Sequence, residues 1–467
     1  MQRVSSSFRD PDAFIYSKNG QIFRQINKSY KNHYSQLMNS GLYDSLSQKE
    51  WLIPHDEIDE SDNSNNENSN LDHKNSWKII KPEKLNFISY PYEWSFSQLK
   101  EAALLTLKIH RQALEYGMSL KDATNFNVQI HNGKMVFIDT CSLEIYEENK
   151  PWIAYKQFCE HFLSPLALMQ YVNINLNDML KLYINGIPLP LTAKLLPFKA
   201  RMNFSIYMHI FLHGSNIAKH QHEHENKKSG NLSLNAHKKL IDNLYSLVKN
   251  LKPHGGYTQW QDYNKLTSYE EDSADSKKEI IKNWFNDIKP VSLVDLGCND
   301  GHYSKLGLEH CKTIIASDMD RNAIDRMWQA NISDNINNIY PTVLNISNPT
   351  PGIGWNNNER NSYYERIREY KPDCVMALAL IHHLSITEQI PLDMLADFFS
   401  QTNSKYVLIE WVPADDHQSI KLIKSRNDQF SEYNEDNFIE QMKKYFSIVE
   451  SKEVPNTKRT LFLFSKK

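Results

Sequence analysis

Glycine is scarce in this chain, which has only 14 glycines in 467 residues. Average usage is about 7%, more than twice this share. We therefore expect each glycine to stand where the backbone needs its conformational freedom. Cysteine is scarcer still, with five scattered residues and no C-x-x-C pair. This pattern excludes a disulfide framework and a cysteine-based zinc site, and it predicts reduced thiols.

Long apolar runs are also missing. No segment approaches the roughly 18 apolar residues of a membrane span, and the first residues, MQRVSSSFRDPDAF, hold no apolar signal core. The formal net charge is −3, with basic and acidic residues interspersed, which argues against a nucleic-acid-binding surface. The sequence predicts a soluble, cytoplasmic protein without membrane or nucleic-acid partners. The tract around His220, His222 and His224 is interpreted as a solvated arm, so no metal site is predicted.

Two polar stretches divide the chain. Residues 56–76 are rich in Asn, Ser and acids and are predicted to form a disordered loop. A second polar, histidine-rich stretch starts at residue 213 and precedes an amphipathic helix, KLIDNLYSLVKNL. These breaks predict an N-terminal α+β domain over 1–212, a polar linker and helix over 213–255, and a further domain over 256–467.

After about residue 275 the pattern alternates between strands and helices. Short apolar runs, SLVDLG, TIIASD, DCVMALAL and YVLIEWV, are typical of parallel strands that are buried on both faces. Helical segments, RNAIDRMWQAN, IPLDMLADFFS and NFIEQMKKYF, lie between or after them. The chain ends in two strand-like runs separated by PNT, which predict a hairpin. The C-terminal fold class is therefore α/β, a doubly wound sheet that ends in an antiparallel pair.

Two of the rare glycines, Gly297 and Gly301, follow the first of these strands in VDLGCNDGHYS. Ligands of doubly wound sheets bind at such a turn, and Asp318 ends the next strand, where an acid can accept hydrogen bonds from ribose hydroxyls. A nicotinamide dinucleotide needs G-x-G-x-x-G, but Asn299 and His302 occupy the second and third glycine positions. An NAD-dependent oxidoreductase is thus the weaker alternative. S-adenosylmethionine has the ribose and adenine without the phosphates.

These motifs, followed by ASDMD, PDCVMALALIHHL and the closing RTLFLFS, resemble a class I S-adenosylmethionine-dependent methyltransferase over residues 260–467. The resemblance implies the strand order 3-2-1-4-5-7-6 with strand 7 antiparallel. It also implies cofactor-binding roles for six residues: Asp295, Gly297, Asn299, Gly301, Asp318 and Asn345. Asn299 replaces the central glycine of the motif, and Asn is the residue that best tolerates left-handed geometry after glycine.

Two histidines are candidates for the chemistry. His382 and His383 follow the fourth strand, where an imidazole could take a proton from a hydroxyl acceptor. We expect such a base to give an apparent pKa near 6.5. No N-P-P-Y-type loop follows this strand, which disfavours an amine acceptor. Glu410 and Trp411 end the fifth strand and are expected to face the same crevice, while Tyr269 is expected to line the substrate pocket as part of its lid.

The N-terminal half carries a second motif. Asp122, Asn127 and Asp139, separated by a short hairpin, resemble the catalytic and magnesium-binding segment of kinase-like phosphotransferases. Arg24 stands where a strand lysine is expected, and no glycine-rich loop appears. An ATP-binding phosphotransferase module, or a bifunctional protein, therefore remains the alternative to a degenerate binding module.

The two halves together resemble a bacterial family of two-domain methyltransferases that includes nodulation-associated proteins. This resemblance extends over nearly the whole chain. It implies methyl transfer from S-adenosylmethionine to a small-molecule or glycan acceptor, whose identity is open.

Overall fold

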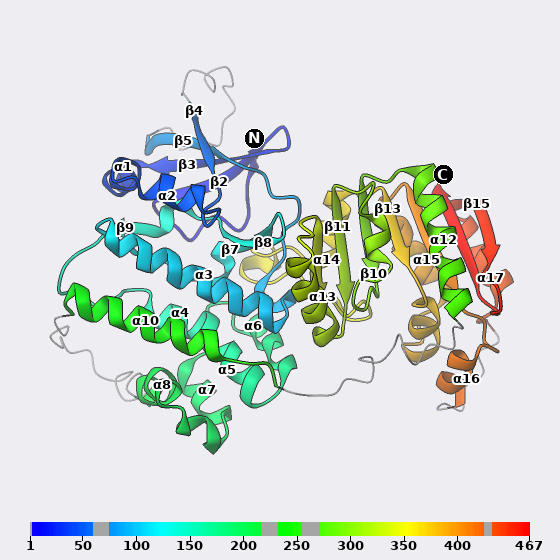
Figure 1. Ribbon diagram of the computed structural model, residues 1–467. Coiled ribbons are helices and arrows are strands. Elements are labelled where there is room, and N and C mark those ends of the chain that lie inside the picture. Colours follow the sequence, from blue (N-terminus) through cyan, green and yellow to red (C-terminus); the bar gives the residue numbers. More distant parts are fainter. Residues whose placement is uncertain (1, 59–73, 216–231, 255–270, 425–431) are drawn as a thin grey trace. The chain divides into compact units, whose positions relative to one another are not determined.

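The computed structural model describes residues 2–58, 74–215, 232–254, 271–424 and 432–467 (Figure 1). The chain forms two compact units. The first comprises Met1–Gly256 and Gly352–Arg360, and the second comprises Tyr257–Pro351 and Asn361–Lys467. No helix among the described residues is long and apolar enough to cross a bilayer. All five cysteines are buried and free.

An antiparallel sheet of five strands begins the first unit. Its order is β1-β2-β3-β5-β4. The strands are β1 (Gln2–Arg3), β2 (Ala13–Lys18), β3 (Gln21–Asn27), β4 (His55–Ile58) and β5 (Ser76–Pro82), and helices α1 (Lys31–Asn39) and α2 (Leu42–Gln48) lie between β3 and β4. Strand β4 therefore includes the start of the loop that was predicted over 56–76, and residues 59–73 of that loop lie outside the described residues.

The remainder of the first unit is mainly helical. Helix α3 (Phe96–Glu115) starts at Ser95, whose hydroxyl accepts from Gln98 N while the Gln98 side chain accepts from Ser95 N. This reciprocal cap satisfies two amides at the helix start. After α3 come two strand pairs, β6 (Met118–Leu120) with β9 (Leu143–Ile145) and the hairpin β7 (Val128–His131) with β8 (Lys134–Phe137).

The helices that follow are α4 (Tyr155–Phe158), α5 (Ser164–Tyr171), α6 (Met179–Leu182), α7 (Leu189–Leu195), α8 (Phe204–Ile206) and α10 (Leu234–Asn250). Helix α10, predicted as part of a linker region, packs on α3 and so belongs to the first unit.

A seven-stranded sheet is the centre of the second unit. Its order is β12-β11-β10-β13-β14-β16-β15, and β16 is antiparallel to both neighbours. The strands are β10 (Ser292–Leu296), β11 (Thr313–Asp318), β12 (Ile339–Val343), β13 (Cys374–Ala377), β14 (Tyr406–Trp411), β15 (Phe446–Glu453) and β16 (Thr460–Lys466). Counted from β10, this is the order 3-2-1-4-5-7-6 that the resemblance implied.

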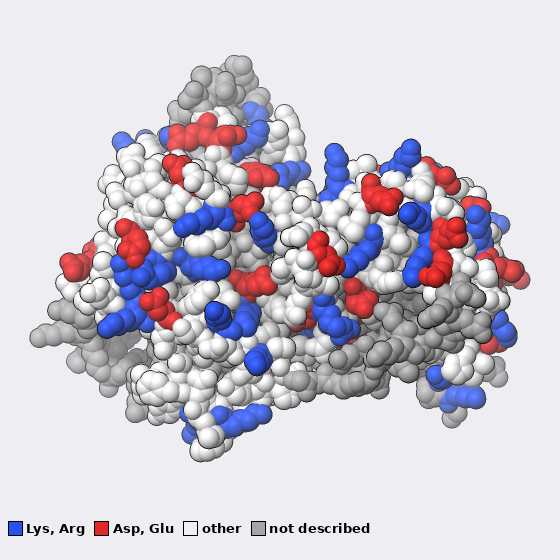
Figure 2. All heavy atoms as spheres, in the orientation of Figure 1, with Lys and Arg blue, Asp and Glu red and all other residues white. Residues whose placement is uncertain are grey.

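Helices flank this sheet (Figure 1). They are α12 (Glu271–Ile288), α13 (Arg321–Ser333), α14 (Tyr363–Tyr370), α15 (Leu392–Gln401), α16 (His417–Lys424) and α17 (Glu435–Lys443). The core between α12 and the strands includes Trp284, Phe285 and Ile314. Basic and acidic side chains are mixed over the face of the molecule in Figure 2, and neither sign gathers in one patch there.

Candidate cofactor and acceptor site

The turn after β10 uses the chain's rare glycines for their backbone conformation. Gly297 and Gly301 have φ of +77° and +82°, and Asn299 between them has φ of +51°. An added Cβ at Gly301 would lie 3.0 Å from the Met327 side chain. Both the conformation and the space therefore favour glycine there. The scarcity of glycine elsewhere makes this turn a site where the backbone itself is needed.

Asp318, at the end of β11, ties this turn to the neighbouring strand. One carboxylate oxygen accepts from Asn299 N at 2.8 Å, and the other accepts from Asp320 N at 2.8 Å. Burial raises the Asp318 pKa to about 6, and these backbone hydrogen bonds oppose the rise. The acid and the glycine turn thus form one continuous edge at the carboxyl ends of β10 and β11.

Asp295 lies inside β10, just before the turn. It is 2% exposed and accepts a hydrogen bond from Ser304 Oγ at 2.6 Å. Burial raises its pKa to about 7, and the nearby charge of Asp318 adds to the rise. Two carboxyl groups with raised pKa values stand side by side at this edge, as is common where a cationic or donor-rich ligand binds.

A pH dependence of cofactor binding follows from these two pKa values. In the role that the resemblance implies, Asp318 accepts hydrogen bonds from the ribose hydroxyls, and an ionised carboxylate is a stronger acceptor than the carboxylic acid formed as pH falls below about 6. We expect the affinity for S-adenosylhomocysteine to be highest above pH 7 and to fall at lower pH, by up to ~10-fold per pH unit for each group that must lose its proton. Calorimetry at pH 5 to 8 measures this. An affinity that does not change between pH 8 and pH 5 would contradict it.

Asn345 follows the edge strand β12. Its Oδ1 accepts from Ser347 N at 3.0 Å and from Ser347 Oγ at 2.8 Å, which holds a tight turn. The preceding residue, Leu344, donates its amide to the Asp318 carbonyl at 2.9 Å. The Asn345 turn is therefore joined to the same edge as the acid and the glycine turn.

The two histidines follow β13. His382 is fully buried, and neither ring nitrogen has a hydrogen-bond partner among the described residues. The His383 ring lies beside it, tilted by 42° with the ring centroids 4.1 Å apart. Burial lowers the pKa of His382 well below its usual value and lowers that of His383 to about 4, and the positive charge of Arg459 adds to both shifts. The expected apparent pKa near 6.5 does not fit these surroundings, because a buried imidazole beside a guanidinium resists protonation.

Glu410 and Trp411 differ from the prediction that both face the crevice. Glu410 is fully buried, and its carboxylate pairs with Lys277 Nζ at 2.5 Å and Arg459 Nη1 at 3.5 Å. Trp411 is also fully buried and stacks on Tyr433 with ring centroids 4.5 Å apart. Successive strand residues point to opposite faces, so these two side chains enter different environments. Neither is available as a direct substrate contact in this structure.

Sequence reasoning missed the partners of Glu410. Arg459 also binds Asp416, with Nε–Oδ2 at 3.0 Å and Nη2–Oδ1 at 3.3 Å. Lys277, from α12, is 2% exposed. Buried charges must be paired, so a lysine and an arginine that fold into the core require nearby acids. No sequence spacing links residues 277, 410, 416 and 459, and only the fold brings them together. Tyr269 lies outside the described residues, as do His220, His222 and His224.

A cavity of about 320 Å³, lined by polar and charged side chains together with Ile420, lies beside this network. Its lining includes Asp415, Asp416, Asn456, Thr457, Lys458 and Arg459. Trp411 at the end of β14 is paired with Thr460 at the start of β16. Because parallel strands share one carboxyl edge, the cavity opens at the same edge of the sheet as the glycine turn.

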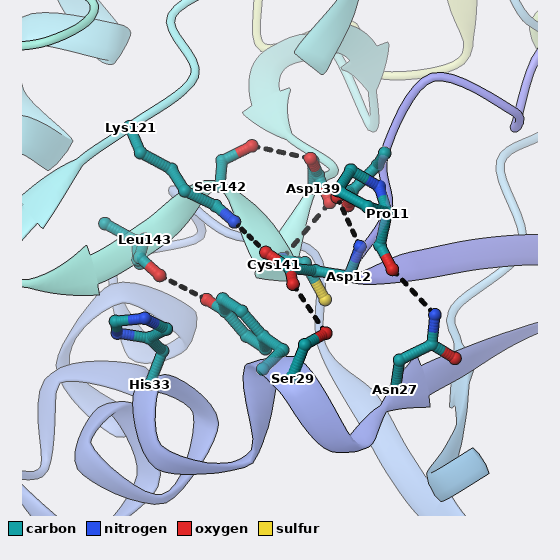
Figure 3. Close-up of polar contacts among 12 residues, drawn as sticks. Pro11, Asp12, Asn27, Ser29, His33, Lys121, Asp139, Cys141, Ser142 and Leu143 are labelled. Atoms are coloured by element: carbon teal, nitrogen blue, oxygen red, sulfur yellow. Dashed lines mark hydrogen bonds and ion pairs between the residues drawn. The ribbon is translucent and has the colours of Figure 1, made fainter. Parts of the chain in front are cut away.

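The first unit contains a second polar cluster, around the Asp139 that the sequence singled out (Figure 3). Arg24 on β3 forms an ion pair with Asp139, and both side chains are largely buried. Asp139 also accepts from Ser142 Oγ at 2.6 Å and Cys141 N at 3.1 Å. Asn127 donates to Ser142 Oγ at 3.0 Å. The predicted Asn127 and Asp139 thus come close together, but through Ser142 and with Arg24 as the cation.

The Asp122 carboxylate forms hydrogen bonds with nearby residues of the same unit. Its Oδ1 accepts from Thr124 N at 3.1 Å and from Gln157 Nε2 at 2.7 Å. The loop between β1 and β2 carries Asp10 and Asp12, and Asp12 pairs with Lys121 (Figure 3). Carboxylates on this loop would repel phosphate groups. Among the described residues, no three His, Cys, Asp or Glu side chains gather as a metal site. The kinase-like likeness of this unit remains a prediction.

We predict that Arg24 replaces a metal ion as the partner of Asp139. Arg24→Ala should lower the free energy of unfolding by about 3–5 kcal/mol, because it leaves a buried carboxylate unpaired. The double variant Arg24→Met/Asp139→Asn should be less destabilised than Arg24→Ala. Denaturant unfolding measures both. Magnesium-dependent ATP binding by the wild type that disappears in Asp139→Ala would instead support a phosphotransferase.

Comparison with known proteins finds a relative that aligns with nearly the whole chain. No family model matches it. The nodulation protein NoeA of Rhizobium meliloti (strain 1021) is 30% identical over 477 aligned positions, which cover 99% of this chain and 96% of NoeA. The chain belongs to the NoeA family. The aligned positions extend through both units of this chain.

Solved structures resemble only part of the chain. The N-methyltransferase NodS from Bradyrhizobium japonicum WM9 covers 42% of it at 11% identity with a TM-score of 0.32, and 98% of NodS is matched. The methyltransferase domain of bacterial CtHen1 covers 41% at 14% identity with a TM-score of 0.31, and 99% of that domain is matched. Likenesses this low assign no activity. The strand order itself identifies the second unit as a class I methyltransferase fold of this nodulation-associated family.

Proposed function

We propose that this NoeA relative is a methyltransferase that uses S-adenosylmethionine as its cofactor. The observation that carries the proposal is the hydrogen bond from Asn299 N to Asp318, which joins the left-handed glycine turn to the acid at the end of the next strand. Two glycines and an asparagine in left-handed conformation bring the backbone close to a ligand, and the acid can accept from both ribose hydroxyls. The Asn345 turn on the same edge would meet the adenine.

The acceptor is a hydroxyl group of a small molecule or glycan. The cavity beside Arg459 supports this. Its two acids and two cations are paired, Lys458 with Asp415 at 2.5 Å and Arg459 with Asp416 at 3.0 Å, so the lining is balanced in charge. A neutral ligand with many hydroxyls can both donate to the acids and accept from the cations, Asn456 and Thr457. A polyanion would gain nothing from such a lining.

S-adenosylmethionine, when bound, supplies a methyl group activated by a sulfonium. In-line displacement at that methyl group would require the acceptor oxygen to be held on the axis of the bond to sulfur, so positioning is the first task of this chain. The acceptor hydroxyl must also lose its proton. His383, beside the fully buried His382, is the candidate for the group that takes it, although burial and Arg459 lower its pKa to about 4 and make it a weak base.

Calorimetry with S-adenosylhomocysteine and NADH tests the cofactor, and transfer of labelled methyl groups from S-adenosylmethionine to cell-derived glycans and metabolites tests the reaction. We expect binding of the first ligand and none of the second, because Asn299 and His302 place side chains where a pyrophosphate needs glycine. Tight binding of NADH alone would favour the oxidoreductase.

A further inference from the structure

Residues 352–360 form a small closed loop that leaves the methyltransferase sequence between β12 and α14, yet these residues belong to the first unit. We name this loop the strap. Ile353 and Arg360 close it through two hydrogen bonds, Ile353 N to Arg360 O at 3.1 Å and Arg360 N to Ile353 O at 3.0 Å. The strap is thus a defined structure with two fixed ends.

Two of the chain's 14 glycines lie in the strap, and each is needed there. A Cβ on Gly352 would lie 2.3 Å from the Asn357 carbonyl oxygen, and one on Gly354 would lie 2.6 Å from Glu359 Cβ. Gly354 also has φ of +82°. In a chain so short of glycine, two such positions within three residues mark a loop whose shape matters.

The strap is fastened to the two loops that border the Asp139 cluster. Glu359 is 2% exposed and accepts from Arg9 Nε at 2.6 Å and Arg9 Nη2 at 2.8 Å. Arg9 precedes Asp10 and Asp12 on the β1–β2 loop. The Arg360 guanidinium lies 4.4 Å from the centre of the Phe126 ring, in the loop that carries Asp122 and Asn127. A bidentate arginine–carboxylate pair with one buried partner is the stronger kind of surface ion pair.

The other side of the strap continues directly into the cofactor edge. The segment before it, 345–351, starts with the Asn345 turn and is held by Tyr364 Oη, which donates to the Ile346 carbonyl at 3.0 Å. The Thr350 carbonyl accepts from Tyr363 N at 3.0 Å. Tyr363 Oη shares a hydrogen bond of 2.8 Å with Ser317 Oγ, next to Asp318. The chain before the strap therefore leads back to Asn345, the proposed adenine contact. The chain after it leads to Tyr363, which hydrogen-bonds next to Asp318, the proposed ribose contact.

We propose that the N-terminal unit positions the Asn345 turn of the cofactor site through the strap, with the Arg9–Glu359 ion pair as its fastening. This rests on the proposed function, because it assigns the 345–351 segment to the cofactor site. Arg9 and Phe126 then hold the strap, and the Asp139 cluster, whose carboxylate is paired with Arg24, need not bind a nucleotide. Arg9 and Glu359 are positioning residues, and neither touches the cofactor.

Arg9→Ala tests the fastening, since the Arg9 side chain is half exposed and the buried Glu359 keeps the Trp355 amide and the Arg360 guanidinium as partners. Arg9→Lys is the conservative variant, and Arg111→Ala is the matched control, because Arg111 pairs on the surface of the same unit with Glu115. Amide hydrogen exchange of residues 345–351 in cofactor-free protein should rise several-fold in Arg9→Ala, recover partly in Arg9→Lys and stay unchanged in Arg111→Ala. Affinity for S-adenosylhomocysteine should fall about 5-fold or more in Arg9→Ala only.

The two measurements separate the two proposals. Faster exchange without any binding of S-adenosylhomocysteine by the wild type would support the strap and defeat the proposed cofactor. Tight binding that is equal in wild type and Arg9→Ala, with unchanged exchange over 345–351, would support the cofactor and overturn the strap.

Discussion

Replacing Asp318 should abolish measurable binding of S-adenosylhomocysteine while leaving the second unit folded. The carboxylate is expected to accept from both ribose hydroxyls, and a hydrogen bond to a charged group contributes about 1.5–3 kcal/mol. Loss of both corresponds to an affinity decrease of roughly 10²-fold or more. Calorimetric titration of Asp318→Asn and Asp318→Ala measures it.

The choice of variant matters because Asp318 also serves the protein. Its two oxygens accept from the amides of Asn299 and Asp320, so Asp318→Ala leaves both donors without their partner. Asp318→Asn keeps one acceptor oxygen and the size of the side chain, which makes it the cleaner test. Asp320→Asn, which keeps the helix-capping oxygen of α13, is the matched control and should bind normally. Wild-type affinity in Asp318→Asn, with wild-type thermal stability, would remove Asp318 from the cofactor site.

The C-terminal fold could be predicted because its strands are buried on both faces. The runs 313–318 and 406–411 have apolar centres and are buried over most of their length, and the structure forms β11 and β14 there. The apolar runs did not include β12, which only the strand order of the resemblance implied; Pro341 lies in its middle, and proline in a sheet is usually found at an edge strand. β12 is indeed at the edge of the sheet.

The site was predictable only where one motif carries it. Gly297, Gly301 and Asp318 follow strand ends that the pattern locates, so they come together as expected at one edge. The buried network of Lys277, Glu410, Asp416 and Arg459 could not be predicted, because its charges come from four separate elements and pair only after the chain has folded. The periodicity of apolar residues predicts which face of a helix or strand is buried, but it does not predict which charged side chain of another element pairs with a buried charge on that face.

The N-terminal cluster illustrates a different limit. The spacing of Asp122, Asn127 and Asp139 was visible in the sequence, and the hairpin β7–β8 between Asn127 and Asp139 is present. What the spacing did not reveal is the cation. Arg24 reaches Asp139 from β3 and forms an ion pair with it. The Asp139 carboxylate therefore has a cationic partner without a metal ion. A motif therefore predicts where carboxylates gather, while the side chains opposite them decide what they bind.

Removal of the proposed base, His383 or His382, should lower the rate without loss of cofactor binding. General-base catalysis contributes about 10²–10⁴-fold, so whichever of His383→Gln and His382→Gln removes the base should reduce kcat by that amount. Glutamine keeps a polar side chain of similar length but cannot accept a proton at neutral pH. Affinity for S-adenosylhomocysteine should be unchanged in both variants, which separates a chemical role from a binding role.

The pH profile distinguishes the two histidines from a base in solvent. A base is active only when neutral, and burial with the nearby Arg459 charge lowers the pKa of His383 to about 4. We therefore expect kcat of the wild type to stay level from about pH 8 down to about pH 5 and to fall only as pH approaches 4, rather than to halve near 6.5.

The free energy of unfolding also decreases as pH falls. Histidines that are neutral when folded bind protons in the unfolded state as pH falls below about 6.5, so the folded state loses stability between there and pH 4. Circular dichroism over the same range must accompany the kinetics, so that loss of fold is not mistaken for loss of base. If kcat falls at pH 6.5 while the fold is intact, or if both glutamine variants keep full turnover, the proton goes to another group and both histidines are structural.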